Sequence, residues 1–244
     1  MENDQAPRDE RSRDYYDDFS KGYERERHHG YHALLDELEL DVVIPYAEGR
    51  EVLEVGCGTG LILEKLAAAA RRAEGVDLSP GMLEHARQRG LTVKEASATE
   101  LPYPDNSFDT VCSFKVLAHV PDIQKALSEM ARVCRPGGHV LAELYNPWSL
   151  RFLAKRIAGP GKISDGRTEA DVYTRWDAPP KLRGMLPPEL DFVEVCGIRV
   201  VTPAAFVHNL PFMSKLLPTI ERAAIRSPAR WFGGFLIVIG RKRG

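Results

Sequence analysis

Cysteine is scarce in this sequence and is never paired at close spacing. The four cysteines stand far apart, and no CxxC pair occurs; they are Cys57, Cys112, Cys134 and Cys196. This spacing argues against a zinc ribbon and against the disulfide framework of a small secreted domain, so we expect four reduced thiols. A chain of 244 residues can bury a sizeable core without such staples.

Long apolar runs are also missing. The longest strongly apolar stretch is Phe235–Ile239, far short of the ~20 residues that a membrane-spanning helix needs. The first residues are rich in charge and contain no apolar signal region, so we expect no secretory peptide. Together with the cysteine pattern, these absences favour a cytoplasmic protein without a transmembrane segment.

The chain has no overall excess of one charge. It holds 33 Lys and Arg against 35 Asp and Glu, a net charge of −2, so we expect no nucleic-acid partner. The two signs are unevenly distributed, however. Residues 151–244 contain 16 basic and 8 acidic residues and carry +8, whereas residues 1–150 carry −10. The basic C-terminal portion favours an anionic substrate or a membrane surface.

The N-terminal residues are too polar to form a core. Residues 1–13 are dense in charge, and we expect a disordered tail there. Residues 14–45 are predicted to form a helical lid, because their aromatic side chains are spaced to share one helical face: Tyr15, Tyr16, Phe19 and Tyr23. An amphipathic helix follows and is expected to end at Pro45.

Strands and helices alternate from residue 46 onward. We expect strands at 51–55, 73–76, 92–96, 110–114 and 140–145, helices at 61–70, 80–89 and 123–133, and a turn at 135–138. Further on we expect a glycine-rich loop at 159–167, helices at 179–190 and 210–225, and strands at 192–201 and 235–239. The pattern predicts an α/β fold with a doubly wound, mostly parallel seven-stranded sheet and helices on both faces. Residues 46–244 would form one domain, with a ligand-binding core at 46–145 and substrate-side elements at 146–244.

The most informative segment is the run Glu51–Val55 and the turn after it, Gly56-Cys57-Gly58-Thr59-Gly60. Glycine has no Cβ and tolerates positive φ, so this turn lets the backbone approach a ligand closely. In an open α/β sheet the turn lies at the carboxyl ends of the parallel strands, where ligands bind. Asp77 ends the next strand, and a carboxylate there can accept hydrogen bonds from both hydroxyls of a ribose. A nucleotide-like ligand is therefore expected.

The glycine spacing bears on which nucleotide is bound. Dinucleotide-binding turns have glycines at the first, third and sixth positions. Here they occupy the first, third and fifth, and Leu61 is the sixth residue. An NAD(P)-dependent oxidoreductase is therefore the alternative reading.

Four ordered stretches point to a family. They are EVGCGTG at 54–60, VDLSPGML at 76–83, LPYPDNSFD at 101–109 and RVCRPGG at 132–138. With them the chain resembles the class I S-adenosylmethionine-dependent methyltransferases, in particular the small-molecule branch that includes the quinone-ring methyltransferases. The resemblance covers residues 45–145 well and 14–45 loosely. It implies a Rossmann-like fold, S-adenosylmethionine as cofactor, S-adenosylhomocysteine as product, and no metal.

The resemblance also implies roles for matching residues. Glu54 and the turn Gly56–Gly60 would hold the methionine part of the cofactor, and Asp77 the ribose hydroxyls. Leu78 and Met82 would lie beside the adenine.

Three further positions carry expectations from the resemblance. Ser97-Ala98 stands where the family usually has Asp-Ala at the adenine amino group; serine can accept a hydrogen bond but brings no charge. Phe114 and Lys115 would line the sulfonium end, the alternative for Lys115 being a solvated charge at the rim. Tyr15 and Tyr23 of the lid would contact the cofactor.

Catalysis by such an enzyme needs alignment of the acceptor and exclusion of water, and a general base only if the acceptor loses a proton. His119, after the fourth strand, is the candidate base, with packing of its loop as the alternative. His28, His29 and His32 include an i, i+4 pair, but no Glu completes an HExxH pattern, so we expect no metal.

Other classes of methyltransferase are disfavoured by their motifs. Enzymes that methylate exocyclic amines of DNA carry an Asn/Asp-Pro-Pro-aromatic tetrad after the fourth strand, where this chain has Ser113-Phe114-Lys115-Val116. Pyrimidine C5-methyltransferases often use a Pro-Cys nucleophile, and no cysteine here follows a proline. A noncatalytic protein that binds the cofactor remains an alternative.

The acceptor is predicted to be a small apolar or aromatic molecule, such as a quinone, a polyketide or a lipid-like compound, with O-methylation ahead of N- or C-methylation. Its pocket would draw on the C-terminal aromatic and apolar residues Trp148, Phe152, Tyr173, Trp176, Phe206, Phe212, Met213 and Trp231. The oligomeric state is left open.

Overall fold

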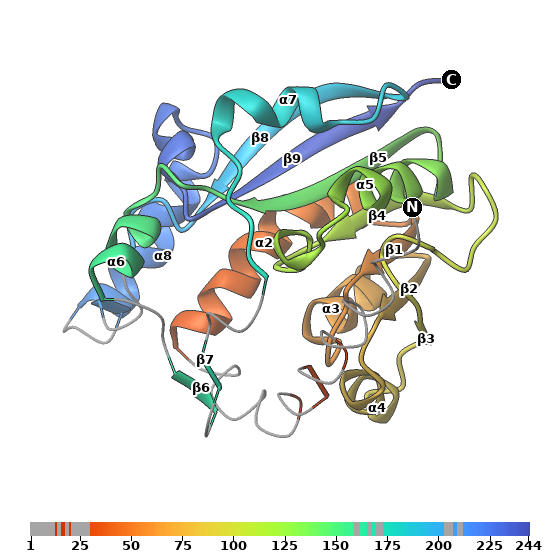
Figure 1. Cartoon of the computed structure of the whole chain (residues 1–244), viewed down its shortest axis with the longest axis horizontal. Helices are drawn as coiled ribbons and strands as arrows, with labels where there is room; N and C mark the ends of the chain where they lie inside the picture. The colour runs from red at the N-terminus through yellow and green to blue at the C-terminus, as the bar shows by residue number, and fades with distance from the viewer. Residues whose placement is uncertain are drawn as a thin grey trace.

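The fold is seen in a computed structural model that describes residues 13, 16, 17, 20, 30–158, 162–164, 167–168, 173–202, 207–208 and 212–244. A seven-stranded sheet has the order β3-β2-β1-β4-β5-β9-β8 (Figure 1). Its strands are β1 (Glu51–Val55), β2 (Arg72–Asp77), β3 (Val93–Glu95), β4 (Phe108–Ser113), β5 (Cys134–Tyr145), β8 (Leu190–Ile198) and β9 (Phe235–Lys242). The first five pair in parallel, whereas β9 is antiparallel to both β5 and β8. The predicted seven-stranded, mostly parallel α/β sheet is confirmed.

Helices cover both faces of the sheet, because the strands bury side chains on both sides. In β1 and β4, consecutive residues enter opposite cores: Leu53 and Val111 join one, Val52 and Cys112 the other. The first core is closed by α5 (Ile123–Val133) and α7 (Leu182–Met185). The second is closed by helices α2 (Tyr31–Ala47), α3 (Leu61–Ala69) and α8 (Met213–Ala224). The remaining helices of regular form are α4 (Pro80–Gln88) and α6 (Leu150–Ala158).

The sequence predicted that helix α2 ends at Pro45, and that prediction was wrong. The helix continues to Ala47 with the proline inside its last turn. Proline removes one backbone hydrogen bond, but Val42, Val43 and Ala47 are fully buried against the sheet. Their packing holds the last turn in helical form.

Two further local predictions were wrong in detail. Residues 135–138, predicted as a turn, are part of β5, where the pairing with β4 shifts register between Phe108 and Thr110. Residues 179–190 form only a 3₁₀ turn (Pro179–Lys181) and the four-residue α7, since Leu186 precedes a proline and takes an extended conformation.

The glycine-rich segment 159–167, predicted as a loop, contains one short strand and borders another. β6 (Lys162–Ser164) and β7 (Arg167–Thr168) pair with each other in an antiparallel hairpin. The predicted tail, except Arg13, and most of the predicted lid before Gly30 lie outside the described residues.

No helix among the described residues is both long enough and apolar enough to cross a membrane.

Candidate cofactor and acceptor site

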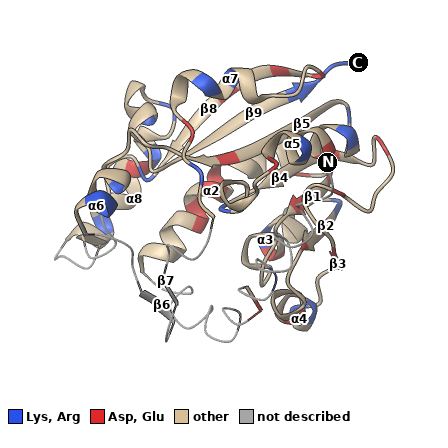
Figure 2. Ribbon diagram, viewed as in Figure 1, with Lys and Arg blue, Asp and Glu red and all other residues tan. Residues whose placement is uncertain are grey.

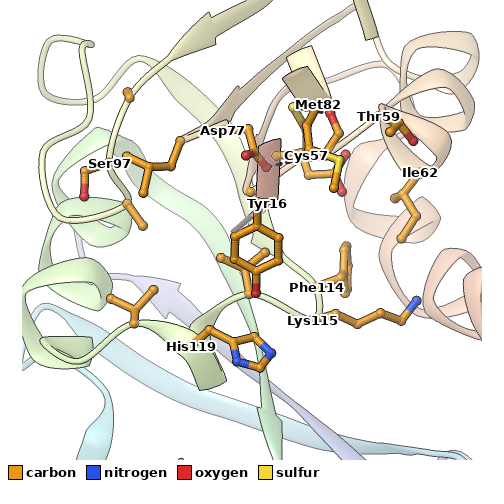
Figure 3. Close-up of a pocket in the computed structure, with 18 of the residues that line it drawn as sticks. Tyr16, Cys57, Thr59, Ile62, Asp77, Met82, Ser97, Phe114, Lys115 and His119 are labelled. Atoms are coloured by element: carbon orange, nitrogen blue, oxygen red, sulfur yellow. Dashed lines mark hydrogen bonds between the residues drawn. The ribbon is translucent and has the colours of Figure 1, made fainter. Parts of the chain in front are cut away.

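A cavity opens at the carboxyl ends of β1, β2 and β4 (Figure 3). Twelve of the residues singled out in the sequence line it: Glu54, Gly56, Cys57, Gly58, Asp77, Leu78, Met82, Ser97, Ala98, Phe114, Lys115 and His119. They come from four strand ends and the starts of the helices that follow. Tyr15 and Tyr23 lie outside the described residues, and Gly60 does not line the cavity.

The glycine turn gives the cavity its floor. Gly56, Gly58 and Gly60 all have positive φ, of 78°, 54° and 86°. A Cβ on Gly58 would meet nothing within 4 Å, whereas one on Gly56 would lie 2.2 Å from Val116 and one on Gly60 2.4 Å from Leu91. Gly58 therefore leaves open space above the turn, while Gly60 serves the start of α3 and its packing.

Asp77 ties this turn to the start of α4. Its carboxylate accepts hydrogen bonds from the backbone N–H groups of Gly58 at 2.8 Å and Ser79 at 3.0 Å. Burial raises the pKa of Asp77, against the lowering effect of these two donors. Each carboxylate oxygen has a second lone pair, so the group can still accept from a ligand in the cavity.

Ser97 is held by its neighbours at another wall of the cavity. Its hydroxyl lies 2.9 Å from the hydroxyl of Thr99 and accepts from the Thr99 backbone N–H at 3.3 Å. The side chain therefore fixes the local turn, and the family's Asp position keeps a neutral hydrogen-bonding group here.

Lys115 is neither solvated nor directed into the middle of the cavity. Its ammonium donates to Asp36 at 2.6 Å and to Glu39 at 2.9 Å, both on α2, and its side chain is only 16% exposed. Its backbone has φ of 60°, in the left-handed region. The alternative of a solvated rim charge is therefore wrong, because Asp36 and the buried Glu39 of α2 draw the ammonium inward.

Two more buried carboxyls complete this group, which we call the acid cluster: Asp36, Glu39, Glu54 and Glu143. Oε2 of Glu54 and Oε2 of Glu143 have no hydrogen-bond partner among the described residues. Burial, and then the charge of Glu39, raises the pKa of both groups well above the ordinary range. Lys115 offsets only part of the repulsion within the cluster, so the protonated, neutral forms of Glu54 and Glu143 are favoured.

Sequence reasoning missed three members of the acid cluster. Glu39 stands within the apolar stripe of α2, next to Leu38, and a charge in such a stripe is a signal that could have been used. Glu143 carries no such signal, because a strand buried on both faces shows no contrast between its sides.

His119 lines the cavity from the 3₁₀ turn Leu117–His119 that follows β4. Its Nδ1 is 2.9 Å from the carbonyl oxygen of Tyr173, and its Nε2 is 3.3 Å from the hydroxyl of Tyr145. A proton on Nδ1 can donate to that carbonyl, which leaves Nε2 as the acceptor. Tyr145, which the sequence did not single out, packs on Trp176 and Phe235.

The C-terminal aromatic residues separate into three groups. Tyr173, Trp176 and Phe152 lie near His119: the Tyr173 carbonyl contacts its ring, Trp176 packs on Tyr145, and Phe152 packs on Trp176 with ring centroids 4.7 Å apart. Trp231 packs against the first core, on the other face of the sheet. Trp148 and Phe212 are exposed, and Phe206 lies outside the described residues.

The N-terminal segment reaches the cavity at the described residues. Tyr16 lines it and forms an edge contact with His119, and Figure 3 shows its ring across the middle with the hydroxyl toward His119 and Lys115. Asp17 accepts hydrogen bonds from the Ser79 hydroxyl and, at 2.9 Å, from the Gly81 backbone N–H at the start of α4.

The described residues contain no group of three or more His, Cys, Asp or Glu side chains arranged to hold a metal ion; His28 and His29 lie outside them.

Comparison with known proteins places the chain in a family. A family model described as a methyltransferase domain matches residues 53–142. The methyltransferase GfsG of Streptomyces halstedii is 32% identical over 75% of this chain and 68% of its own length. A ubiquinone biosynthesis O-methyltransferase of Alkalilimnicola ehrlichii is 35% identical over 46% of this chain and 49% of its own.

A solved structure shares the fold. It is an S-adenosylmethionine-dependent methyltransferase of Thermotoga maritima, with a TM-score of 0.68, 21% identity, and coverage of 93% of this chain and 98% of that one. The chain spans about half the length or less of several curated relatives that it matches, between 39% and 50% for three of them. The match to GfsG extends well beyond the shared cofactor motifs, and on it the chain belongs to the S-adenosylmethionine-dependent methyltransferases.

Proposed function

We propose that the protein binds S-adenosylmethionine in this cavity and transfers its methyl group to a small organic acceptor. One observation carries the proposal: the open space above Gly58 belongs to a cavity that is also lined by two carboxyls, the buried Glu54 and the half-buried Asp77. The cofactor has a cationic methionine end and a ribose with two hydroxyls, which suit two separated carboxyls.

The residues fit the cofactor by their chemistry. The partnerless Oε2 of Glu54, in the acid cluster, would accept from the methionine ammonium, and Asp77 from the ribose hydroxyls. Leu78 and Met82 offer apolar surface for the adenine, beside Ser97 and the backbone of Ala98. A ligand cation beside Glu54 would relieve the repulsion that burial with Asp36 and Glu39 imposes.

S-Adenosylmethionine brings a methyl group on a positively charged sulfur, which is already a strong methyl donor. The chain then has to align an acceptor and exclude water. His119 would take a proton from a hydroxyl acceptor through Nε2, because a proton on Nδ1 can be held by the Tyr173 carbonyl. The Tyr145 hydroxyl holds Nε2 in place until an acceptor replaces it.

The acceptor is proposed to be apolar or aromatic, of quinone, polyketide or lipid-like type. Aromatic rings near His119, on the proposed acceptor side, support this choice, since Trp176 packs on both Tyr145 and Phe152. The A. ehrlichii relative is named as an O-methyltransferase of ubiquinone biosynthesis, which favours a quinone-like acceptor and O-methylation. A cytoplasmic location stays a prediction.

Calorimetry of Asp77→Ala tests the assignment of the cavity. The variant would lose a charge-assisted hydrogen bond worth ~1.5–3 kcal/mol, so the affinity for S-adenosylhomocysteine should fall about 10- to 150-fold. Asp109→Ala is the matched control, since Asp109 also accepts from a backbone N–H, that of Glu51, and lies outside the cavity. Its affinity should equal that of the wild type.

Three results would contradict the proposal. An unchanged affinity of folded Asp77→Ala for S-adenosylhomocysteine would show that Asp77 does not bind the ribose. Binding of NAD without binding of S-adenosylhomocysteine would favour the oxidoreductase alternative. Tight binding of S-adenosylhomocysteine with no methylated product from a panel of phenols, quinones and polyketides, read by mass spectrometry, would favour a noncatalytic binding protein.

A further inference from the structure

Helix α6 exposes its apolar side chains to solvent, which is the reverse of what is usual for a helix that packs on a core. Leu150, Leu153 and Ile157 are 47%, 56% and 80% exposed, while Arg151 is 8% exposed. The three apolar residues are spaced by three and four, so they form one stripe along the helix. Surface helices normally bury their apolar stripe, and α6 instead presents it outward.

Helix α8 carries a second exposed stripe. Phe212, just before its first residue, is 84% exposed, and Leu216 and Ile220 are 50% and 38% exposed. These residues are four apart and follow one side of the helix. The opposite side holds the buried residues Leu217, Glu221 and Ala224.

Both helices lie at the same end of the molecule. Figure 1 shows them together, at the end away from β3. Arg199, directly after β8, interacts electrostatically with both Arg151 of α6 and Glu221 of α8. We call the six residues Leu150, Leu153, Ile157, Phe212, Leu216 and Ile220 the apolar end face. Trp148, before α6, is also half exposed.

The exposed charged residues of α6 and α8 themselves have one sign. α6 contains Lys155 and Arg156 and no acidic residue, and in Figure 2 its ribbon carries the blue that marks Lys and Arg. α8 adds Lys215, while its single acid, Glu221, is buried and accepts from the backbone N–H groups of Val200, Val201 and Thr202. Arg222 is offset by Glu37 and Asp41 of α2 and does not contribute.

We propose that the apolar end face docks on a lipid bilayer that contains anionic headgroups. Amphipathic helices with basic flanks lie in the bilayer interface with their apolar side among the acyl chains, and tryptophan favours that boundary. A protein partner would need matching acids for Lys155, Arg156 and Lys215, and an anionic headgroup layer supplies them along the whole face. The inference is independent of the proposed methyl transfer.

The face also lies beside the acceptor side of the cavity. Phe152 of α6 packs on Trp176, which packs on Tyr145, the partner of His119. Tyr173, whose carbonyl contacts His119, is itself 52% exposed. Docking through α6 and α8 would therefore bring the acceptor side close to the bilayer.

Vesicle co-sedimentation tests the proposal with the full chain. Vesicles of phosphatidylcholine with about one third phosphatidylglycerol should pellet the protein at low salt, and pure phosphatidylcholine should pellet less of it. Leu153→Ser/Ile157→Ser should lower the partition coefficient at least ~10-fold, since two exposed side chains lose their apolar contact. Lys155→Gln/Arg156→Gln should remove the preference for phosphatidylglycerol.

Val193→Ser is the matched control, because Val193 is a 43% exposed apolar residue on the outer strand β8 and lies outside the face. It should bind vesicles as the wild type does. The proposal is overturned if the wild type stays in the supernatant with anionic vesicles, or if Leu153→Ser/Ile157→Ser pellets like the wild type. If the wild type does not bind vesicles but sediments as a dimer, and only Leu153→Ser/Ile157→Ser dissociates that dimer, the face would be a contact with a second copy of the chain instead.

Discussion

Buried carboxyls set the character of the cavity at the scale of single residues. Three of them, with the half-buried Asp36, surround Lys115, and their repulsion is a cost that the ligand-free protein bears. Breaking such a network leaves uncompensated charge, so its parts are coupled. The members come from α2, β1 and β5, which explains why no local motif in the sequence revealed them together.

The raised pKa of Glu54 predicts a pH-dependent stability. From about pH 4 upward the unfolded chain releases this proton first, so the native state holds more protons and the free energy of unfolding falls as the pH rises. Glu54→Gln has no ionisable group at this position, so its free energy of unfolding should not fall with pH in this way. We expect its thermal midpoint to exceed that of the wild type at pH 8 and to match it more closely near pH 4.5, measured by calorimetry.

The same variant should bind S-adenosylhomocysteine at least ~10-fold more weakly, because the amide carries no charge. Glu84→Gln, on the exposed side of α4, is the control and should change neither property. A Glu54→Gln protein that is less stable at pH 8, or that keeps full affinity, would contradict the prediction.

His119 predicts a pH limb in turnover. A neutral imidazole has to accept the proton of a hydroxyl acceptor, so kcat should fall at low pH, where the imidazole is protonated. His119→Ala should lower kcat about 100-fold or more and leave the affinity for S-adenosylhomocysteine unchanged. The control is His139→Ala, because His139 packs on Tyr46 away from the cavity. Full turnover of His119→Ala would return the residue to a packing role.

At the scale of elements, the N-terminal segment is predicted to close over the cavity. Asp17 joins it to the start of α4 through Ser79 and Gly81, and Tyr16 faces His119. Hydrogen exchange at residues 16–20 should slow when S-adenosylhomocysteine saturates the protein, and Asp17→Ala should lessen the slowing. Deletion of residues 1–12 should leave binding intact. Identical hydrogen exchange with and without ligand would contradict the prediction that this segment is a lid.

Replacement of glycine by alanine is predicted to cost more stability at the start of α3 than at the end of α4. Gly60→Ala has to hold a φ of 86° and also place its Cβ 2.4 Å from Leu91, so it should cost ~2–5 kcal/mol. Gly90→Ala has a similar φ of 76° but open space around its Cβ, so it should cost only ~1–2 kcal/mol. Urea unfolding measures both. Equal losses would show that the contact with Leu91 carries no weight.

Local patterns predicted most elements, and their failures have physical causes. Alternating β and α signals, with glycine after Val55 and Asp77 at the end of β2, were sufficient for the parallel half of the sheet. Pro45 misled because burial of Ala47 outweighs one lost hydrogen bond. In the site, the cofactor motifs lie close together in the chain and were found. Asp36, Glu143 and Tyr145 approach the cavity only through tertiary packing.

At the scale of the whole molecule, one sheet joins the two halves of opposite charge. Its parallel strands carry the proposed cofactor side, and His119 after β4 and Tyr145 at the end of β5 mark the proposed acceptor side. Helices α6 and α8 of the apolar end face follow β5 and β8. We expect cofactor binding and bilayer docking to vary separately, because none of the six residues of the apolar end face lines the cavity.

Synthesis of the chain delivers β9 last among the seven strands, although β9 lies between β5 and β8 in the sheet. On the ribosome, β8 therefore emerges before the strand with which it pairs and has to wait for it. β1 to β5 can pair as they appear, because their partners have already been made. The glycine turn and Asp77 would then be in place on a nascent chain whose β5 edge is still open, and the last strand to arrive would close that edge.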